Sequence, residues 1–167
     1  MAALDHLDLA LIARLQDSGR TPLVELAKQL GVSHGTIRNR LERLQTDGIL
    51  KVVATVEPVR VGFPIQVLIG INADLRRMVT IEKHLATFQE VTFVATLTGR
   101  LDFIIGAAFA SSDDLRHFLQ EKLAKVAGIR RTETFHILDL GKRLWQWAVP
   151  VATARPPQSV RRARRRR

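Results

Sequence analysis

The chain has 167 residues, of which 46% are hydrophobic and 25% are charged, a balance typical of one ordinary folded domain or two small ones. The absence of cysteine excludes disulfides, zinc fingers and thiol chemistry. The net charge of +10 arises mainly after Pro150, where seven arginines and no acid occur, so the rest of the chain carries about +3. The longest near-apolar stretch, Phe103–Ala110, is far shorter than the roughly 18 residues of a membrane span, and we expect no signal peptide and a cytoplasmic location.

Residues 4–50 are predicted to form three helices. Leucines recur at steps of three and four over Leu4–Leu15, which gives the single apolar stripe of an amphipathic helix. Thr21 is expected to cap a second helix with Pro22 at its first position, and Gly31 is expected to end that helix in a left-handed conformation.

A third helix is predicted from its N-cap, Ser33, to Gly48, with Ile37, Leu41 and Leu44 on its inner face. Two helices joined by a short glycine-containing turn make the helix-turn-helix pattern. In proteins with this pattern the second of the two helices enters the major groove of DNA, and its N-terminal part reaches the bases.

The outward face of the third helix carries the candidate DNA contacts. Arginine bonds bidentately to guanine and asparagine to adenine, a helix N-terminus suits a phosphate, and glycine permits close approach. On this basis the candidate DNA-binding residues are Ser33, His34, Gly35, Thr36, Arg38, Asn39, Arg40 and Arg43. Arg40 lies beside the apolar stripe, where an ion pair with Glu25 explains it as well as a phosphate contact does. Residues 1–50 contain six basic and six acidic side chains, so charge alone does not distinguish a DNA-reading face from a solvated one.

Residues 51–65 are expected to be a strand-like linker. Val, Ile and Thr are frequent in Ile49–Val56, as they are in strands, and Pro58 and Gly62 interrupt the pattern. The sequence therefore divides into a helix-turn-helix domain (1–50), this linker (51–65), a second domain (66–150) and a basic disordered tail (151–167).

The second domain alternates between strand and helix patterns. Apolar residues alternate in the segments predicted as strands and recur at steps of three and four in those predicted as helices. The predicted order is strand 66–73, helix 78–88, strand 91–98, strand 103–110, helix 111–126 and strand 129–140. This β-α-β-β-α-β order is the ferredoxin-like arrangement.

Two helices cannot cover both faces of the predicted four-stranded sheet. The strand over 103–110 is nevertheless apolar on both of its faces, so the second face needs a partner. A second copy of the chain is the simplest partner, and we expect a homodimer through this domain.

The turn Thr98–Asp102 combines a hydroxyl, a glycine, a cation and an anion, groups that suit a zwitterionic ligand. An ordinary hairpin turn explains the same residues, and Thr132 and Thr134 are usual strand residues.

The five histidines are scattered without metal spacing, no glycine-rich phosphate loop occurs, and Asp113 and Asp114 suit the start of a helix. We therefore expect no enzyme activity, no cofactor and no metal.

The chain resembles the Lrp/AsnC family, the feast/famine regulators, over about residues 4–142. The combination of matching residues is specific, whereas no single one is. The matching residues are Leu4-Asp5, Asp8, Leu15-Gln16-Asp17-Ser18-Gly19-Arg20, Glu25-Leu26-Ala27, Gly31-Val32-Ser33, Thr36-Ile37, Arg40-Leu41, Leu44, Gly48-Ile49-Leu50, Thr98-Gly99, Asp102, Gly128-Ile129, Thr132, Thr134 and Leu138.

The resemblance implies an α+β protein in which a winged helix-turn-helix is joined to a ferredoxin-like domain for effector sensing and dimerisation. It implies a cytoplasmic, nucleoid-associated regulator that binds double-stranded DNA as a homodimer, tetramer or octamer and has no membrane partner. Its effectors would be amino acids or related metabolites, bound near the glycine turn between subunits. The effector-binding candidates are Thr98, Gly99, Arg100, Asp102, Thr132 and Thr134.

Two features depart from the family pattern. Arg100-Leu101 follows the glycine where many members have an aromatic or small polar residue, which changes the charge of the pocket. The arginine-rich tail is also outside the pattern, and it is either a solvated end or a segment attracted to polyanions.

Some proteins similar to this family are sirohaem decarboxylases, which is the alternative function. Such an enzyme needs histidines or arginines that converge on a tetrapyrrole pocket, and the scattered histidines do not favour it.

Overall fold

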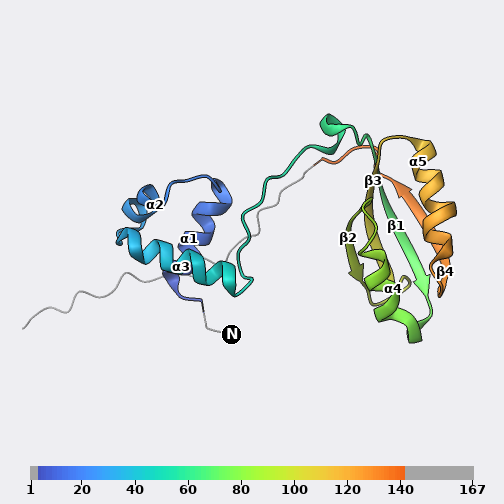
Figure 1. The fold of residues 1–167 in the computed structure, drawn as a ribbon, viewed down its shortest axis with the longest axis horizontal. Helices are drawn as coiled ribbons and strands as arrows, with labels where there is room; N and C mark the ends of the chain where they lie inside the picture. The colour runs from blue at the N-terminus through green and yellow to red at the C-terminus, as the bar shows by residue number, and fades with distance from the viewer. Residues whose placement is uncertain (1–3, 142–167) are drawn as a thin grey trace, which may run out of the picture. The chain divides into compact units, whose positions relative to one another are not determined.

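The computed structural model describes residues 4–141, which form two compact units divided between Ala54 and Thr55 (Figure 1). The predictions for residues 142–150 and for the tail, 151–167, lie outside the described residues. Within the described range, no helix has the length and apolar character needed to cross a membrane.

The first unit consists of the three predicted helices, α1 (His6–Asp17), α2 (Leu23–Leu30) and α3 (His34–Thr46). A capping box starts α1: the Asp5 carboxylate accepts from the Asp8 N–H at 2.9 Å, and the Asp8 carboxylate accepts from the Asp5 N–H at 3.0 Å. Gly31 ends α2 with φ of 68°, the left-handed conformation expected for it. The helices pack around a core that includes Leu11, Leu26, Ile37 and Leu44.

The predicted cap of α2 is wrong by one residue. Pro22 is the N-cap, and its carbonyl accepts from the Leu26 N–H at 3.0 Å. The hydroxyl of Thr21 instead donates back to the Ser18 carbonyl at 2.9 Å. Thr21 therefore satisfies a carbonyl at the end of α1 and closes the loop between the helices.

The first part of the predicted strand-like linker, residues 51–57, forms no strand. A segment rich in β-branched residues still needs a neighbouring strand to bond with, and the described residues provide none here. A single 3-10 turn, η1 (Pro58–Val61), follows it. Residues 4–54 contain helices and no strand. This stretch therefore holds no strand that could form the wing implied by the resemblance.

The second unit has the predicted β-α-β-β-α-β order. Its main elements are β1 (Ile65–Ala73), α4 (Met78–Leu85), β2 (Val91–Thr96), β3 (Phe103–Phe109), α5 (Ser112–His117) and β4 (Ile129–His136). A short turn, η2 (Leu75–Arg77), precedes α4. The four strands form one antiparallel sheet in the order β2-β3-β1-β4 (Figure 1).

The helix predicted over 111–126 is divided. After α5 the chain forms one π-helical turn, η3 (Phe118–Lys122), and then a 3-10 turn, η4 (Leu123–Lys125). Phe118 and Leu123 are five residues apart and both buried, which the wider turn allows and a regular α-helix does not favour.

The core of the second unit lies between one face of the sheet and its helices. Alternate residues of the two central strands are buried there with residues of α4, among them Val67, Ile69, Ile71, Phe103, Ile105, Ile81 and Leu85. Because side chains alternate across a strand, the residues between them point to the opposite face. We call that opposite side the open face of the sheet.

Candidate DNA-binding surface and effector-binding region

The N-terminus of α3 is fixed by a side-chain cap, as predicted. The Ser33 hydroxyl accepts from the Thr36 N–H at 3.1 Å, and the two hydroxyls lie 2.8 Å apart. His34 and Gly35, in the first turn, are exposed. These two exposed residues lie at the positive end of the helix dipole, where an anion is favoured.

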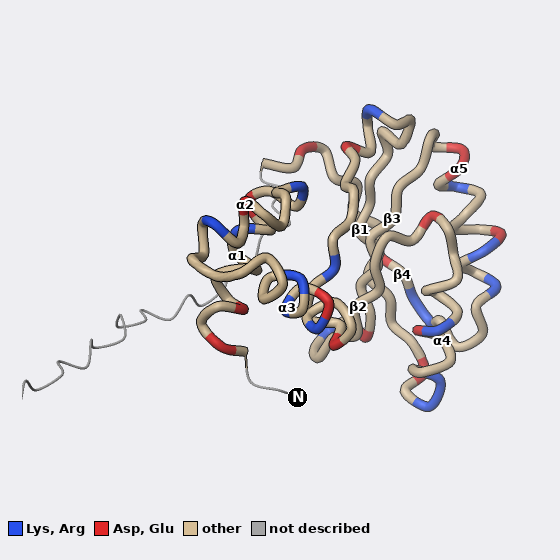
Figure 2. The backbone as a smooth tube through the Cα atoms, turned by 60° about the vertical axis from the view of Figure 1, so that its left-hand side comes forward, with Lys and Arg blue, Asp and Glu red and all other residues tan. Residues whose placement is uncertain are grey.

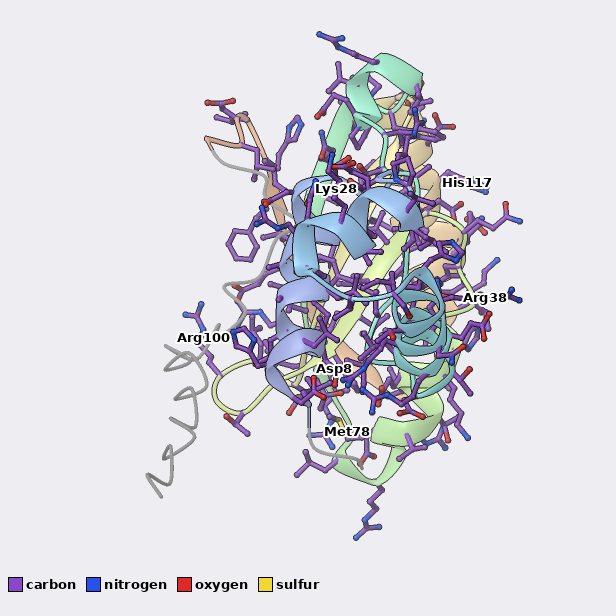
Figure 3. The ribbon with its side chains drawn as sticks, turned by 90° about the vertical axis from the view of Figure 1, so that its left-hand side faces the viewer. Asp8, Lys28, Arg38, Met78, Arg100 and His117 are labelled. Atoms are coloured by element: carbon purple, nitrogen blue, oxygen red, sulfur yellow. The ribbon has the colours of Figure 1, made fainter. Side chains whose placement is uncertain are left out.

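Arg38 and Asn39 are adjacent, exposed residues on the outward side of α3. Figure 3 labels Arg38 on this helix. The Arg38 side chain is 66% exposed, and its Nε donates to Glu42 Oε1 at 2.9 Å, one turn further along the helix. Because both side chains are mostly exposed, water screens this ion pair and it adds little to stability. Little free energy therefore holds Arg38 to Glu42, and its guanidinium is accessible to another acceptor.

Arg40 and Arg43 point to α1 rather than outward. Arg40 Nη1 donates to Asp8 Oδ1 at 2.9 Å and also to an oxygen of Asp5, and Arg43 Nη2 donates to Asp8 Oδ2 at 2.5 Å. The alternative partner of Arg40, Glu25, instead accepts from the neighbouring glutamine of α2, so that predicted ion pair is wrong.

The ion pairs change the titration of both carboxyls. The hydrogen bond from Arg40 lowers the pKa of Asp5 from 3.8 to about 2, with help from the Asp8 backbone. Burial alone would raise the pKa of Asp8, but hydrogen bonds from Arg40, from the Asp5 backbone and from Arg43 outweigh it and lower that pKa. Both groups are therefore ionised at neutral pH.

The eight candidate DNA-binding residues thus separate into two sets. Six lie at the helix N-terminus or on the outward side of α3, whereas Arg40 and Arg43 lie against α1. Figure 2 shows basic and acidic positions side by side along α3, consistent with a surface that is not strongly basic.

Sequence reasoning gave no role to Asp5 and Asp8. An acid three residues before another acid, ahead of an apolar run, is a capping-box signal that would have indicated them.

The turn Thr98–Asp102 is bonded to the end of β1. The Asp102 N–H donates to the Ile71 carbonyl at 2.9 Å, and Asp102 Oδ2 accepts from the Ala73 N–H at 2.8 Å. Asn72 Nδ2 donates to the Arg100 carbonyl at 2.6 Å. Asp102 therefore has a structural role, whatever it contributes to binding a ligand.

Arg100 is the exposed cation of this turn (Figure 3). Its side chain is 82% exposed and lies 3.7 Å from Glu133 of β4. Gly99, beside it, has φ of 126°, a conformation that favours glycine.

Thr132 and Thr134 lie on the other face of β4. They are paired opposite Ile71 and Ile69, whose side chains are in the core, and directly opposite residues of an antiparallel pair share a face. Glu133, the partner of Arg100, is paired opposite Gly70 on the open face. Within one chain, the structure does not bring the two threonines together with the Thr98–Asp102 turn.

Two of the cavities in the second unit differ in their lining residues. One of about 540 Å³ is lined by apolar side chains such as Val61, Phe63 and Phe109 and by Glu90, and none of the effector candidates lines it. A smaller one of about 270 Å³ is lined by Thr132 together with Arg130, Arg131 and apolar residues. Of the described residues, no group of three or more His, Asp or Glu side chains is placed to hold a metal ion.

The open face carries apolar side chains together with polar ones such as Glu133. A Cβ on Gly106 would lie 2.3 Å from the Phe93 ring, and a Cβ on Gly70 would lie 2.7 Å from Leu101, so both side chains rest directly on glycine. Phe93 and Phe135 remain about half exposed on this face.

The fold and these two regions define the class of protein. A helix-turn-helix unit with a polar outward helix, joined to a ferredoxin-like unit with a glycine turn, is a DNA-binding transcriptional regulator with a ligand-binding domain. The model of the AsnC-type helix-turn-helix domain matches residues 4–45, and the model of the Lrp/AsnC ligand binding domain matches residues 66–143. The chain belongs to the Lrp/AsnC family of transcriptional regulators, which are not enzymes.

Individual relatives agree with this assignment. An uncharacterized HTH-type transcriptional regulator of Pyrococcus horikoshii is 31% identical over 146 residues, covering 87% of this chain and 91% of that protein. The structure of AsnC from E. coli has a TM-score of 0.77 at 30% identity and covers 85% of this chain and 97% of that one. A transcriptional regulator of Neisseria meningitidis, solved in complex with L-Met, shares the fold with a TM-score of 0.76 at 24% identity, covering 86% of this chain and 95% of that one.

Proposed function

We propose that this regulator binds specific duplex DNA sequences through the outward side of α3, and that a small molecule changes its DNA binding or its assembly. The observation that carries the proposal is the adjacent, exposed pair Arg38 and Asn39 on a capped helix. These are the side-chain types that bond bidentately to guanine and adenine in the major groove. Ser33, His34, Gly35 and Thr36 would hold a phosphate beside them through the helix N-terminus.

For the effector we propose an amino acid or a related metabolite, bound near the Thr98–Asp102 turn. Arg100 offers an exposed guanidinium to a carboxylate, and its 3.7 Å contact with Glu133 is weak enough to be replaced. The Neisseria meningitidis relative holds L-Met, a molecule with such a carboxylate. Thr132 and Thr134 lie on the other face of β4, away from the face that would pair in a dimer, so another chain would bring them to this site only through a contact between dimers.

The second chain would cover the open face of the sheet. Exposed phenylalanines on an uncovered sheet face are typical of a protein interface, and a two-fold pairing of identical faces satisfies both copies at once. Tetramers and octamers would be built from this homodimer.

The arginine-rich tail would add sequence-independent attraction to DNA and would keep the regulator on the nucleoid. Deletion of residues 155–167, which contain seven arginines, is expected to weaken binding to all duplexes alike. Each phosphate contact contributes about 0.9 to the slope of log affinity against log salt, so the slope should fall by up to about 6. An unchanged slope would remove the tail from DNA binding.

Selection of duplexes from a random pool by the full chain tests the proposed function. We expect a consensus sequence bound at least about a thousandfold more tightly than random duplex, with an affinity that changes when the effector is added. A thermal-shift screen of amino acids identifies that effector, since a ligand that binds only the folded protein raises its melting temperature. Failure to select any consensus would contradict the DNA part, and failure of every amino acid to shift the melting temperature or the affinity would contradict the effector part.

A further inference from the structure

Four charged side chains join α1 to α3, and we call this cluster the clasp: Asp5, Asp8, Arg40 and Arg43. The side chain of Asp8 is 0% exposed, and its two carboxylate oxygens accept from Arg40 at 2.9 Å and from Arg43 at 2.5 Å. Arg40 also bonds to Asp5, whose side chain is about half exposed. The clasp therefore places two guanidiniums, from successive turns of α3, around one buried carboxylate of α1.

Because Asp8 is buried, the clasp requires α3 to keep one orientation relative to α1. A buried ionised carboxylate is tolerated only when it is paired and hydrogen-bonded, so α3 has to keep both guanidiniums at this one position. The apolar contacts of Ile37 and Leu44 hold α3 against its neighbours but have no preferred direction. The clasp consequently fixes the rotation of α3 about its own axis.

This rotation determines what the outward side of α3 presents to DNA. Arg38 and Asn39 are on the same rigid helix as the clasp arginines, and each residue step turns the helix by about 100°. Bidentate contacts with base edges require the donors to be placed within about 0.5 Å. A small rotation of α3 would therefore reduce base selectivity before it affected attraction to phosphates.

We propose that Asp8 is a positioning residue for base recognition, and that Arg40 and Arg43 hold α3 in place and do not contact DNA. The inference rests on the proposed function of α3. Two aspartates and two arginines cancel in charge, so the clasp adds no net positive charge to the first unit. The clasp arginines then contribute nothing to the salt dependence of DNA binding.

The first test is Arg43→Lys in the full chain, measured on the duplex that the wild type selects and on a random duplex of equal length. Lysine keeps the positive charge and any phosphate contact, but it lacks the planar fork of arginine. We expect the ratio of selected to random affinity to fall about tenfold or more, with an unchanged salt slope on random duplex. A retained ratio would overturn the proposal, as would a slope that falls by about 0.9 in Arg43→Gln.

The second test is a cycle of Asp8→Asn, Arg43→Gln and the double variant, read as the same affinity ratio. Coupled residues give a double variant no worse than the poorer single one, whereas independent residues give losses that multiply, which would overturn the proposal. Arg116→Gln is the matched control, because Arg116 has an exposed 2.9 Å ion pair on α5 and is expected to keep the wild-type ratio.

Circular dichroism melting checks that each variant is folded at the assay temperature. If Asp8→Asn does not fold, a cycle of Asp5→Asn with Arg40→Gln tests the half-exposed side of the same clasp by the same criterion. A wild type that selects no consensus duplex would remove the proposed function and this inference together. A selective wild type whose clasp variants multiply in effect or lower the salt slope would remove this inference alone.

Discussion

The outward side of α3 and the Thr98–Asp102 turn place their candidate residues in different ways. Six of the eight α3 candidates lie at the N-terminus or on the outward side of one helix, where a period of 3.6 residues sets the direction of each side chain. The effector candidates come from a turn and from β4, and the register of the sheet puts them on two faces. The difference teaches that a site carried by one element can be predicted from periodicity, whereas a site assembled from several depends on register and on other copies of the chain.

The largest expected effect comes from removing the outward guanidinium of α3. Arg38→Ala should weaken binding to the selected duplex by about 1–3 kcal/mol and relax base choice at one position, because a bidentate base contact is lost. Fluorescence anisotropy on selected and random duplexes measures both losses. Arg116→Ala is the control, since Arg116 matches Arg38 in exposure (67% against 66%) and in ion-pair distance (2.9 Å). Equal losses on both duplexes would make Arg38 a phosphate contact.

The next effect separates structure from binding in the turn. Asp102→Ala removes the acceptor of the Ala73 N–H and should lower the free energy of unfolding by about 1–3 kcal/mol, measured by urea denaturation. Asp102→Asn keeps a carbonyl acceptor and should stay close to wild-type stability. If Asp102→Asn also keeps a full effector response, the carboxylate has no part in effector binding.

A smaller effect concerns the charge of the turn. Arg100→Gln should weaken effector binding by up to about 1 kcal/mol, since the guanidinium acts in solvent, and should leave stability within about 0.5 kcal/mol of wild type. Isothermal titration with the amino acid found in the thermal-shift screen measures the loss. Unchanged affinity would show that the effector carboxylate binds elsewhere.

The smallest effect is a pH dependence of the first unit. The pKa of Asp5 is about 2 in the folded chain, below its ordinary value of 3.8, so the ion pair with Arg40 stabilises fully above pH 3.8. As the pH falls from 3.8 towards 2, the unfolded chain takes up a proton that the folded chain does not, and this stabilisation is lost. Thermal melts of wild type and Asp5→Asn should therefore differ less at low pH than at neutral pH. A constant difference would contradict this account of the ion pair.

The fold was predictable wherever local patterns decide it. The caps at Ser33 and Gly31 and the six main elements of the second unit follow from periodicity and from residue preferences. Three features depended on contacts that no local pattern contains. Thr21 bonds backwards to Ser18, the linker valines find no strand to pair with, and the helix after α5 widens to bury Phe118 and Leu123 together.

The candidate sites show the same division. The exposed set on α3 follows from the helix period, but the inward direction of Arg40 and Arg43 depends on a carboxylate about thirty residues earlier in the chain. Thr132 and Thr134 were grouped with the glycine turn through the family resemblance, which does not state from which copy of the chain they come. Only the strand register shows that, within one chain, the two threonines lie on the opposite face of β4 from Glu133, the partner of Arg100.

Gly70 and Gly106 have a consequence beyond the sheet in which they lie. Neither glycine has a Cβ atom, so a large side chain packs directly on its backbone. Alanine at Gly106 would displace the Phe93 ring from the backbone and make this part of the open face uneven. Two uneven faces touch over a smaller area, so this one added carbon atom would be expected to weaken the association of two chains.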